Sequence, residues 1–369
     1  MNMAIYCHFR FWRVVQTPLS NCTFTVLLLF VASFAGLALP DATNAQSAAS
    51  PTWFVTIVLP PKVVAGYPAT LAVFGADGRL APNVTVTVGN GVSVKTDATG
   101  RAFFTAPASH GVMFAEASGV SAVALVENSS SASPETAAKE LAVAPVLSLK
   151  DRFAICGGGF RGDADGNRVT MNGDRALIVA ASPECLVALP SPRATPGTAK
   201  LSVDSSGTPR TATMTLVSLQ FEEPQPAPVP GQKSGLTVHV EGSVTPLAIV
   251  IQNETPGVVE FLRGDTQELR TSGGSRNIAQ IEVSAIRSGD YSFNAKLLPS
   301  SDLSAAELYL QAAVPLASKS LQRRLKACAD RLASHPKDHE KVRQEVAKMI
   351  STTIPGNFRV LLEAARLAL

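Results

Sequence analysis

The chain has 369 residues and a formal net charge of +3, and 46% of its residues are hydrophobic while only 6% are aromatic. This length allows two to four ordinary domains, each large enough to bury a core of its own. A net charge this small for the size gives no argument for nucleic-acid binding. We therefore expect no nucleic-acid partner.

The first 45 residues have the order of a secretory signal peptide. Arg10 and Arg13 precede an apolar run at 24–39, and small residues surround Ala45. This order is typical of secretion signals, so we expect cleavage near Ala45 and a secreted, periplasmic or cell-surface protein. The run is shorter than the roughly 20 residues that span a bilayer. A retained anchor is the alternative, and any other membrane association would be a surface contact.

Residues 51–127 contain short apolar runs at roughly the 8 to 12 residue spacing of an antiparallel sandwich. The run NVTVTV at 83–88 alternates strictly, and ADG at 76–78 supplies turn residues. The stretch VVAGYPATLAVFGADGRLAPNVTVTV, followed by KTDATGRAFFTAP, resembles the bacterial immunoglobulin-like domains of intimin- and invasin-type surface proteins. The resemblance implies a β-sandwich that acts as a spacer or binding module and has no active site.

Residues 156–174 have the sequence CGGGFRGDADGNRVTMNGD, which allows four interpretations. The first is a dinucleotide-binding loop, because Gly157, Gly159 and Gly162 have the G-x-G-x-x-G spacing. Such a loop must follow a strand and open a helix. Here a second turn and a strand pattern follow Gly162, which argues against a nucleotide.

The other three interpretations concern the polar residues of this stretch. The tripeptide RGD at 161–163 is one that some adhesion receptors bind. Four side chains could offer oxygen ligands to calcium: Asp163, Asp165, Asn167 and Asp174. The strand pattern RVTM would carry the last of these away from the others. We expect the fourth possibility, a turn between two strands, with no metal and no cofactor.

Residues 141–220 resemble an IPT/TIG domain, the immunoglobulin-like sandwich shared by plexins, some transcription factors and many bacterial surface proteins. The resemblance is carried by FAICGGGF at 153–160, by VTMNG at 169–173, and by ASPECLVALP followed by PGTAKLSV. It implies that the glycines let a strand bend close to its neighbour and that Phe160 packs in the core. Members that bind DNA use basic loops, and none is concentrated here.

Three cysteines would remain after signal cleavage, in a compartment that permits disulfides. Cys156 and Cys185 lie within one predicted domain, whereas Cys328 lies in a region of different composition. We expect Cys156 to pair with Cys185 and Cys328 to stay free. The alternative is that both of the first two are small buried hydrophobic residues.

Two segments have linker composition. Residues 127–140 are rich in Ser, Ala and Glu, and residues 221–232 carry proline at every second position from 224 to 230. The second segment should be extended polyproline that spaces its neighbours semi-rigidly. Residues 233–299 again have strand patterns, so we expect a third β-sandwich, with His239 as an ordinary strand-surface residue.

Residues 301–369 change to helical periodicity. The sequence SAAE at 304–307 predicts a capping box. Apolar stripes separated by Pro315, Pro336 and Pro355 predict three or four short amphipathic helices that form a unit separate from the sandwiches.

The C-terminal helical region is also basic. Residues 319–369 hold 11 Lys and Arg against 5 Asp and Glu, a net charge of +6. Arg323, Arg324 and Lys326 cluster in the first half of this segment and are candidates for binding an acidic partner. The alternative is that they lie on solvated faces of a small bundle.

No catalytic constellation is present: there is no G-x-S-x-G elbow, no Walker loop and no H-E-x-x-H motif. His335, His339 and Cys328 raise the question of a metal site. Pro336 interrupts the helix on which the histidines would converge, and the spacing fits no standard zinc set. We expect no enzyme activity, no catalytic residues and no metal.

Together these patterns predict a mainly β fold, with tandem immunoglobulin-like β-sandwiches followed by a small C-terminal α-helical region. The leading function is a noncatalytic secreted or cell-surface protein whose sandwiches are spacer or binding modules for adhesion or extracellular protein interaction. Its partner would be an extracellular or envelope protein or glycan. The alternative is a carbohydrate-binding or accessory module of a polysaccharide-processing system, which the scarcity of aromatic residues disfavours.

Overall fold

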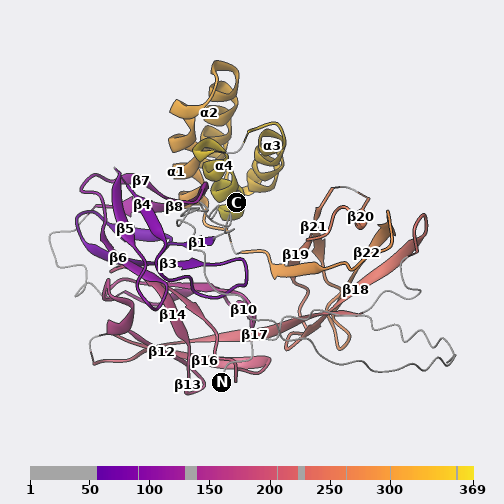
Figure 1. Ribbon diagram of the computed structural model, residues 1–369, viewed down its shortest axis with the longest axis horizontal. Coiled ribbons are helices and arrows are strands. Elements are labelled where there is room, and N and C mark those ends of the chain that lie inside the picture. The colour runs from indigo at the N-terminus through magenta and orange to yellow at the C-terminus, as the bar shows by residue number, and fades with distance from the viewer. Residues whose placement is uncertain are drawn as a thin grey trace, which may run out of the picture. The chain divides into compact units, whose positions relative to one another are not determined.

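The chain forms a mainly β fold of tandem immunoglobulin-like sandwiches followed by four helices, as the sequence predicts (Figure 1). The predicted signal peptide at 1–45 lies outside the described residues, as does most of the segment 127–140. The computed structural model describes residues 56–89, 91–128, 139–205, 207–222, 229–262, 264–299, 301–354 and 356–369.

The first sandwich packs two sheets around one core. Strand β3 pairs with β1 and β6 in one sheet, and the other sheet has the order β2-β8-β7-β4-β5. Alternation decides which residues enter the core: in β6, Ala102 and Phe104 are buried while Phe103 is exposed. The strands are β1 (Thr56–Val58), β2 (Lys62–Val64), β3 (Pro68–Phe74), β4 (Thr85–Val88), β5 (Val92–Lys95), β6 (Arg101–Thr105), β7 (Gly111–Ala117) and β8 (Val120–Glu127).

The second sandwich has its own core, in which Phe160 is fully buried, as expected. Gly157 has φ 143°, and a Cβ atom there would lie 2.5 Å from the carbonyl oxygen of Glu140. The glycine therefore permits the close approach of two chain segments. The strands are β9 (Ala142–Val143), β10 (Val146–Ser148), β11 (Phe153–Cys156), β12 (Arg168–Met171), β13 (Asp174–Arg175), β14 (Leu177–Ala181), β15 (Cys185–Leu189) and β16 (Gly197–Asp204).

The first two sandwiches share a sheet and a small apolar cluster. Ala181 of β14 pairs with Thr70 of β3, which joins β1-β3 to β14-β15-β11-β9. The cluster removes side chains of both sandwiches from water, which favours their association. It consists of Val58, Ala72, Phe74, Val179, Ala180 and Val187.

Strand β17 (Arg210–Glu222) belongs to two sandwiches. Its residues 210–216 pair with β16 of the second sandwich, and its residues 218–222 pair with β18 (Lys233–Glu241) of the third. One sheet therefore continues from the second sandwich into the third, in the order β13-β12-β16-β17-β18-β22-β20.

This pairing differs from the spacer role expected for residues 221–232. Phe221 and Glu222 are the last residues of β17, and Lys233 begins its antiparallel neighbour β18. The segment therefore connects adjacent strands of one sheet, and the third sandwich starts within β17. Composition alone could not distinguish the two roles, because prolines, which lack the N–H for a strand ladder, suit both connections.

The third sandwich faces the sheet of β17, β18, β22 and β20 with a three-stranded sheet of order β21-β19-β23. Its core includes Leu236, Ile249 and Ile251, all fully buried. The remaining strands are β19 (Ala248–Asn253), β20 (Val259–Phe261), β21 (Thr266–Arg270), β22 (Ile278–Ala285) and β23 (Phe293–Leu297).

The C-terminal region contains four α-helices, within the range expected. The capping box predicted at 304–307 is wrong, because α1 begins one residue before Ser304. The Asp302 carboxylate is the N-cap and accepts from the backbone N–H of Ala305 at 3.0 Å. The helices are α1 (Leu303–Ala313), α2 (Lys319–Ser334), α3 (His339–Ser351) and α4 (Asn357–Ala368), with short 3₁₀ turns η2 (Val314–Leu316) and η3 (Pro336–Asp338).

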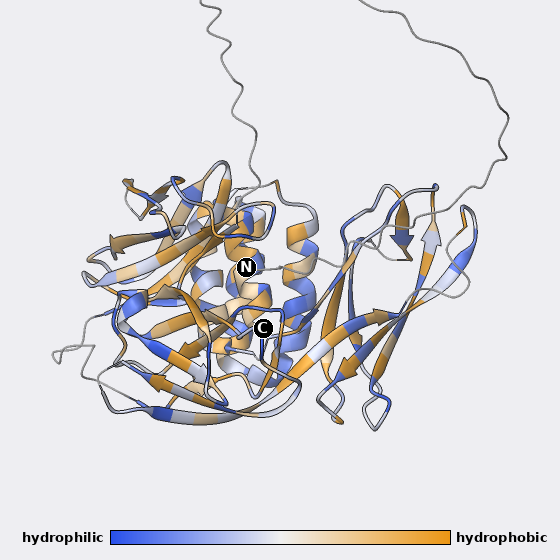
Figure 2. Ribbon diagram, turned by 60° about the horizontal axis from the view of Figure 1, so that its bottom comes forward, coloured by the Kyte–Doolittle hydropathy of each residue, from blue (hydrophilic) through white to orange (hydrophobic). Residues whose placement is uncertain are grey.

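The helices pack against the first sandwich rather than forming the separate unit that we expected. Leu125 of β8 belongs to the same buried cluster as the helices, and Val112, Phe114 and Val123 pack on it. Hydrophobic and hydrophilic residues lie on different sides of the helices (Figure 2), and the apolar sides meet in this cluster. No described helix is both long enough and apolar enough to cross a bilayer.

We predict that Gly242→Ala weakens the junction between the second and third sandwiches. Gly242 has φ 95°, and a Cβ atom would lie 2.4 Å from the carbonyl oxygen of Leu216 in β17. The control is Gly173→Ala, where φ is 91° but no atom lies within 4 Å. The control should lose about 1–2 kcal/mol of unfolding free energy through backbone strain alone. Equal losses for both variants in urea unfolding would contradict the steric argument.

Candidate functional site

The loop after β11 has no nucleotide-binding geometry. The glycines lead into a loop, then into the 3₁₀ turn η1 (Ala164–Gly166), and then into β12. No α-helix follows Gly162, so the phosphate-binding helix terminus of a dinucleotide loop is missing. The interpretation as a connection between two strands is confirmed.

The same loop docks on the first sandwich through a buried threonine and a surface ion pair. Thr70 Oγ1 donates to the carbonyl oxygen of Gly162 at 2.7 Å and accepts from the N–H of Ala164 at 3.3 Å. Arg101 donates from Nη1 and Nη2 to the two carboxylate oxygens of Asp165, each at 2.9 Å. These roles of Thr70 and Arg101 could not be predicted from the sequence, because both residues lie in strand patterns of another domain.

These contacts engage the groups considered for calcium and for receptor recognition. The Asp163 carboxylate accepts from the N–H of Asp165 at 3.1 Å, and the Asn167 side-chain amide donates to the carbonyl oxygens of Arg161 and Asp163. Gly162 is buried. It lies so close to β3 that a Cβ atom at this position would be 2.0 Å from the carbonyl oxygen of Pro68. The centre of the RGD tripeptide is therefore held against another domain. The described residues contain no group of three or more acidic, histidine or cysteine side chains placed to hold a metal.

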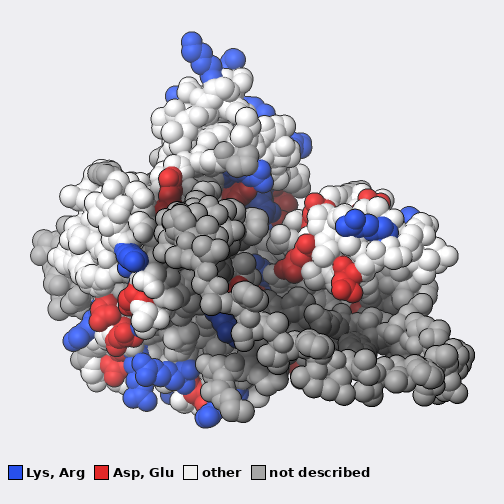
Figure 3. Space-filling model, viewed as in Figure 1, with Lys and Arg blue, Asp and Glu red and all other residues white. Residues whose placement is uncertain are grey.

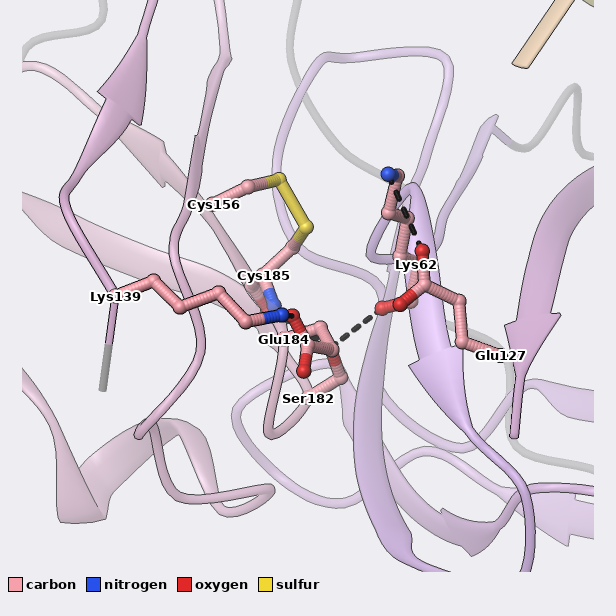
Figure 4. Close-up of a disulfide and its surroundings, with 7 residues drawn as sticks. All are labelled: Lys62, Glu127, Lys139, Cys156, Ser182, Glu184 and Cys185. Carbon is pink, nitrogen blue, oxygen red and sulfur yellow. Dashed lines mark hydrogen bonds and ion pairs between the residues drawn. A yellow bond between two sulfur atoms is a disulfide. The ribbon is translucent and has the colours of Figure 1, made fainter. Parts of the chain in front are cut away.

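The structure confirms the disulfide between Cys156 and Cys185 (Figure 4). The two residues are register partners of β11 and β15, so adjacent strands already bring their side chains together. Cys328 is free and buried in the helical region, and burial raises the pKa of its thiol. A buried thiol with a raised pKa is a poor nucleophile.

The turn next to the disulfide contacts the first sandwich. Ser182 donates from Oγ to the carbonyl oxygen of Lys62 at 2.5 Å. Two ion pairs lie beside it, Lys62 with Glu127 at 3.2 Å and Lys139 with Glu184 at 3.9 Å (Figure 4). Burial raises the pKa of the Glu184 carboxyl, and the nearby Lys139 opposes that shift. The disulfide therefore braces a turn that belongs to a contact between domains.

Helix α2 presents a row of exposed cations that differs in one member from the predicted cluster. Lys319, Arg323 and Lys326 are exposed, and their spacing of four and three residues places them on one side of the helix. Within the described residues they form no ion pair. Arg324 instead turns to α3, where its Nε donates to Glu345 at 2.9 Å. We call Lys319, Arg323 and Lys326 the α2 cation row.

Two other arginines of the helical region are engaged by the third sandwich. Arg343 and Arg366 approach the Glu268 carboxylate of β21 at 3.0 Å and 2.8 Å. Arg343 also pairs with Glu340 on its own helix at 2.8 Å. These guanidinium groups are structural, so they do not extend the α2 cation row.

The histidines considered in the sequence do not converge. The rings of His335 and His339 contact Ser334 Oγ and the carbonyl oxygen of Pro336, respectively. His239 lies half-buried on β18, with its Nε2 2.7 Å from a Glu222 oxygen. This hydrogen bond lowers the pKa of the Glu222 carboxyl. Each histidine therefore has a local partner of its own.

The fold and these surfaces define a multidomain immunoglobulin-like protein with a helical C-terminal region. No family model and no curated protein matches the chain. Many solved structures are distantly similar to it, and three of them are described below; at these identities the similarity concerns the fold alone.

The first of these structures is the plexin A4 extracellular region, at 12% identity and TM-score 0.24, with 69% of this chain and 24% of that chain covered. The second is Bacteroides ovatus SGBP-B in complex with a mixed-linkage heptasaccharide, at 11% identity and TM-score 0.23, with 64% of this chain and 72% of that chain covered. The third is invasin, a bacterial integrin-binding protein, at 17% identity and TM-score 0.18, with 65% of this chain and 56% of that chain covered. The chain thus spans about a quarter of the plexin structure.

We predict that Thr70→Val destabilises the protein by about 1–3 kcal/mol, because the variant leaves the buried Gly162 carbonyl and Ala164 N–H without their side-chain partner. The matched control is Thr105→Val on β6, where the threonine is exposed. Thermal and urea unfolding would measure both variants. A loss no larger than that of the control would show that the docked loop does not depend on Thr70.

We predict that removing the disulfide by a Cys156→Ala, Cys185→Ala double change costs about 3–4 kcal/mol of unfolding free energy. The bridge spans a sequence separation of 29. Closing a loop of that size lowers the conformational entropy of the unfolded chain, which corresponds to about 3–4 kcal/mol of unfolding free energy. Alkylation of the denatured, nonreduced protein should modify Cys328 and neither partner. Mass spectra with all three cysteines alkylated would contradict the pairing.

Proposed function

We propose that the chain is a noncatalytic secreted or cell-surface binding protein, and that the α2 cation row attaches it to an acidic extracellular or envelope partner. The observation that carries the proposal is the exposure of Lys319, Arg323 and Lys326 without an ion pair among the described residues. Cations grouped on one helix face without an ion pair attract an anionic ligand.

The contrast with neighbouring basic residues supports this choice. Arg324, Lys341, Arg343, Arg359 and Arg366 all pair with carboxylates. In Figure 3 lysine and arginine side chains gather on the outer part of the helical region, at the top of the view, where few acidic residues lie. Five of the eleven Lys and Arg at 319–369 thus pair with carboxylates, whereas the α2 cation row, like Arg331, Lys337 and Lys348, forms no ion pair among the described residues. The row groups three such cations on one side of a single helix.

The sandwiches supply the support for this face. In sequence, the first sandwich resembles bacterial immunoglobulin-like domains and the second resembles IPT/TIG domains. Domains of both kinds occur as spacer or binding modules of surface proteins. The helices share a buried cluster with the first sandwich. A partner bound at α2 would therefore be attached to the sandwiches through a packed core.

The test is a double charge reversal, Arg323→Glu with Lys326→Glu, in the full secreted protein. The wild type should be retained on immobilised heparin and polyglutamate and on the producing cells, and salt should weaken retention, because exposed charges are screened beyond roughly 8 Å at physiological ionic strength. The reversed variant should lose at least ten-fold in binding.

The matched control reverses two exposed cations of the second sandwich, Arg168→Glu with Lys200→Glu. It changes the net charge by the same amount and should leave binding within two-fold of wild type. Equal losses in both variants would mean that only overall charge matters. Unchanged binding of the α2 variant would place recognition elsewhere.

A further inference from the structure

A polar groove of about 530 Å³ lies where the first sandwich meets the start of α4. This volume is within the range of small-ligand sites. Strands β4, β7 and β8 provide one wall, and Gly356 and Asn357 provide the other. Six polar side chains line it: Thr85, Thr87, Glu116, Ser118, Ser121 and Asn357.

Three of these side chains form a row across the sheet. Thr87 of β4 is the register partner of Glu116 of β7, and Glu116 is the register partner of Ser121 of β8. Register partners project from the same face, and adjacent strands lie about 4.8 Å apart. The row therefore offers a hydroxyl, a carboxylate and a second hydroxyl at regular intervals along the groove.

The polar groups of the groove are free to bind a ligand. None of the six side chains takes part in a hydrogen bond or ion pair with another described residue, in contrast to the polar side chains of the docked loop, such as Asn167. Hydroxyls and an amide both donate and accept, whereas the carboxylate accepts only. The set can thus satisfy a ligand that carries several hydroxyl groups.

The backbone of the groove carries strain at one of these residues. Ser118 and Gly119 form the two-residue turn between β7 and β8, with φ 51° at Ser118 and 79° at Gly119. Such turns favour Asn, Asp or Gly at the first position, and a non-glycine residue in the left-handed region is costly. Ser118 supplies a hydroxyl at the mouth of the groove in place of a residue that would be more stable there.

We infer that this groove binds a neutral carbohydrate through hydrogen bonds to its hydroxyl groups. Glu116 is the one charged residue of the lining, so an anionic ligand would be repelled. The lining has two glycines and one alanine but no large apolar side chain, so a peptide would lack the buried anchor that most protein interfaces need. The site is distinct from the α2 cation row and goes beyond the function proposed above.

The test measures binding of neutral hexasaccharides of glucose, mannose and galactose to the full secreted protein by saturation-transfer NMR and calorimetry. We expect at least one of them to bind. Glu116→Ala should weaken that binding at least ten-fold, because hydrogen bonds to a charged group are among the stronger ones. Thr87→Val, which keeps the shape but removes the hydroxyl, should weaken it several-fold.

Two controls separate this site from other effects. Glu260→Ala removes an exposed glutamate from β20 in the third sandwich and should leave saccharide binding unchanged. The Arg323→Glu, Lys326→Glu variant should also bind saccharide normally, so failure of the proposed function would leave this result intact. Absence of binding for all three saccharides, or binding that survives Glu116→Ala and Thr87→Val in folded protein, would overturn the inference.

Discussion

The hydrogen-bond ladder along β17 is the constraint on which the arrangement of the sandwiches depends. Its first half is paired in the second sandwich and its last five residues are paired in the third. Leu216, the last residue of the first half, contributes to the second core, and Leu219, in the second half, contributes to the third. A change in the angle between these sandwiches would therefore break backbone hydrogen bonds or expose a core residue, and each carries a cost in free energy.

Neighbouring residues of one turn in the second sandwich connect it to both of the other sandwiches. The guanidinium of Arg152 lies 4.9 Å from the ring centre of Phe74 in the first sandwich. Burial raises the pKa of the adjacent Asp151 carboxyl, while Lys296 and the backbone N–H of Leu297, both in the third sandwich, oppose that shift. Buried charges are tolerated only with such partners. Arg152 and Asp151 thus each have a partner in another sandwich.

Local patterns in the sequence were sufficient for the fold class and the disulfide, because each depends on alternation, turn residues or cysteines within one domain. The burial of Phe160 was predicted from the resemblance to IPT/TIG domains. Pairings between distant segments could not be predicted in this way. The sequence of β8 did not indicate that Leu125 packs with helices, since a partly apolar strand face has the same pattern whether another element covers it or not. Arg324 was assigned to the binding cluster for the same reason, because its partner Glu345 lies on another helix.

The α2 cation row and the groove both lie on packed or paired secondary-structure elements, which reduces the conformational entropy that their side chains lose on binding. The α2 cation row lies on a helix whose opposite side is buried through Leu325, Cys328 and Leu332. Thr87, Glu116 and Ser121 of the groove lie on β4, β7 and β8, whose backbone pairing holds the three residues in register. Side chains on such elements lose less conformational freedom on binding than side chains on loops, so weak individual contacts retain more of their free energy. This compensates for the shortage of aromatic residues, which made a carbohydrate site difficult to find from composition, since hydrogen-bonding groups in fixed register can replace ring stacking.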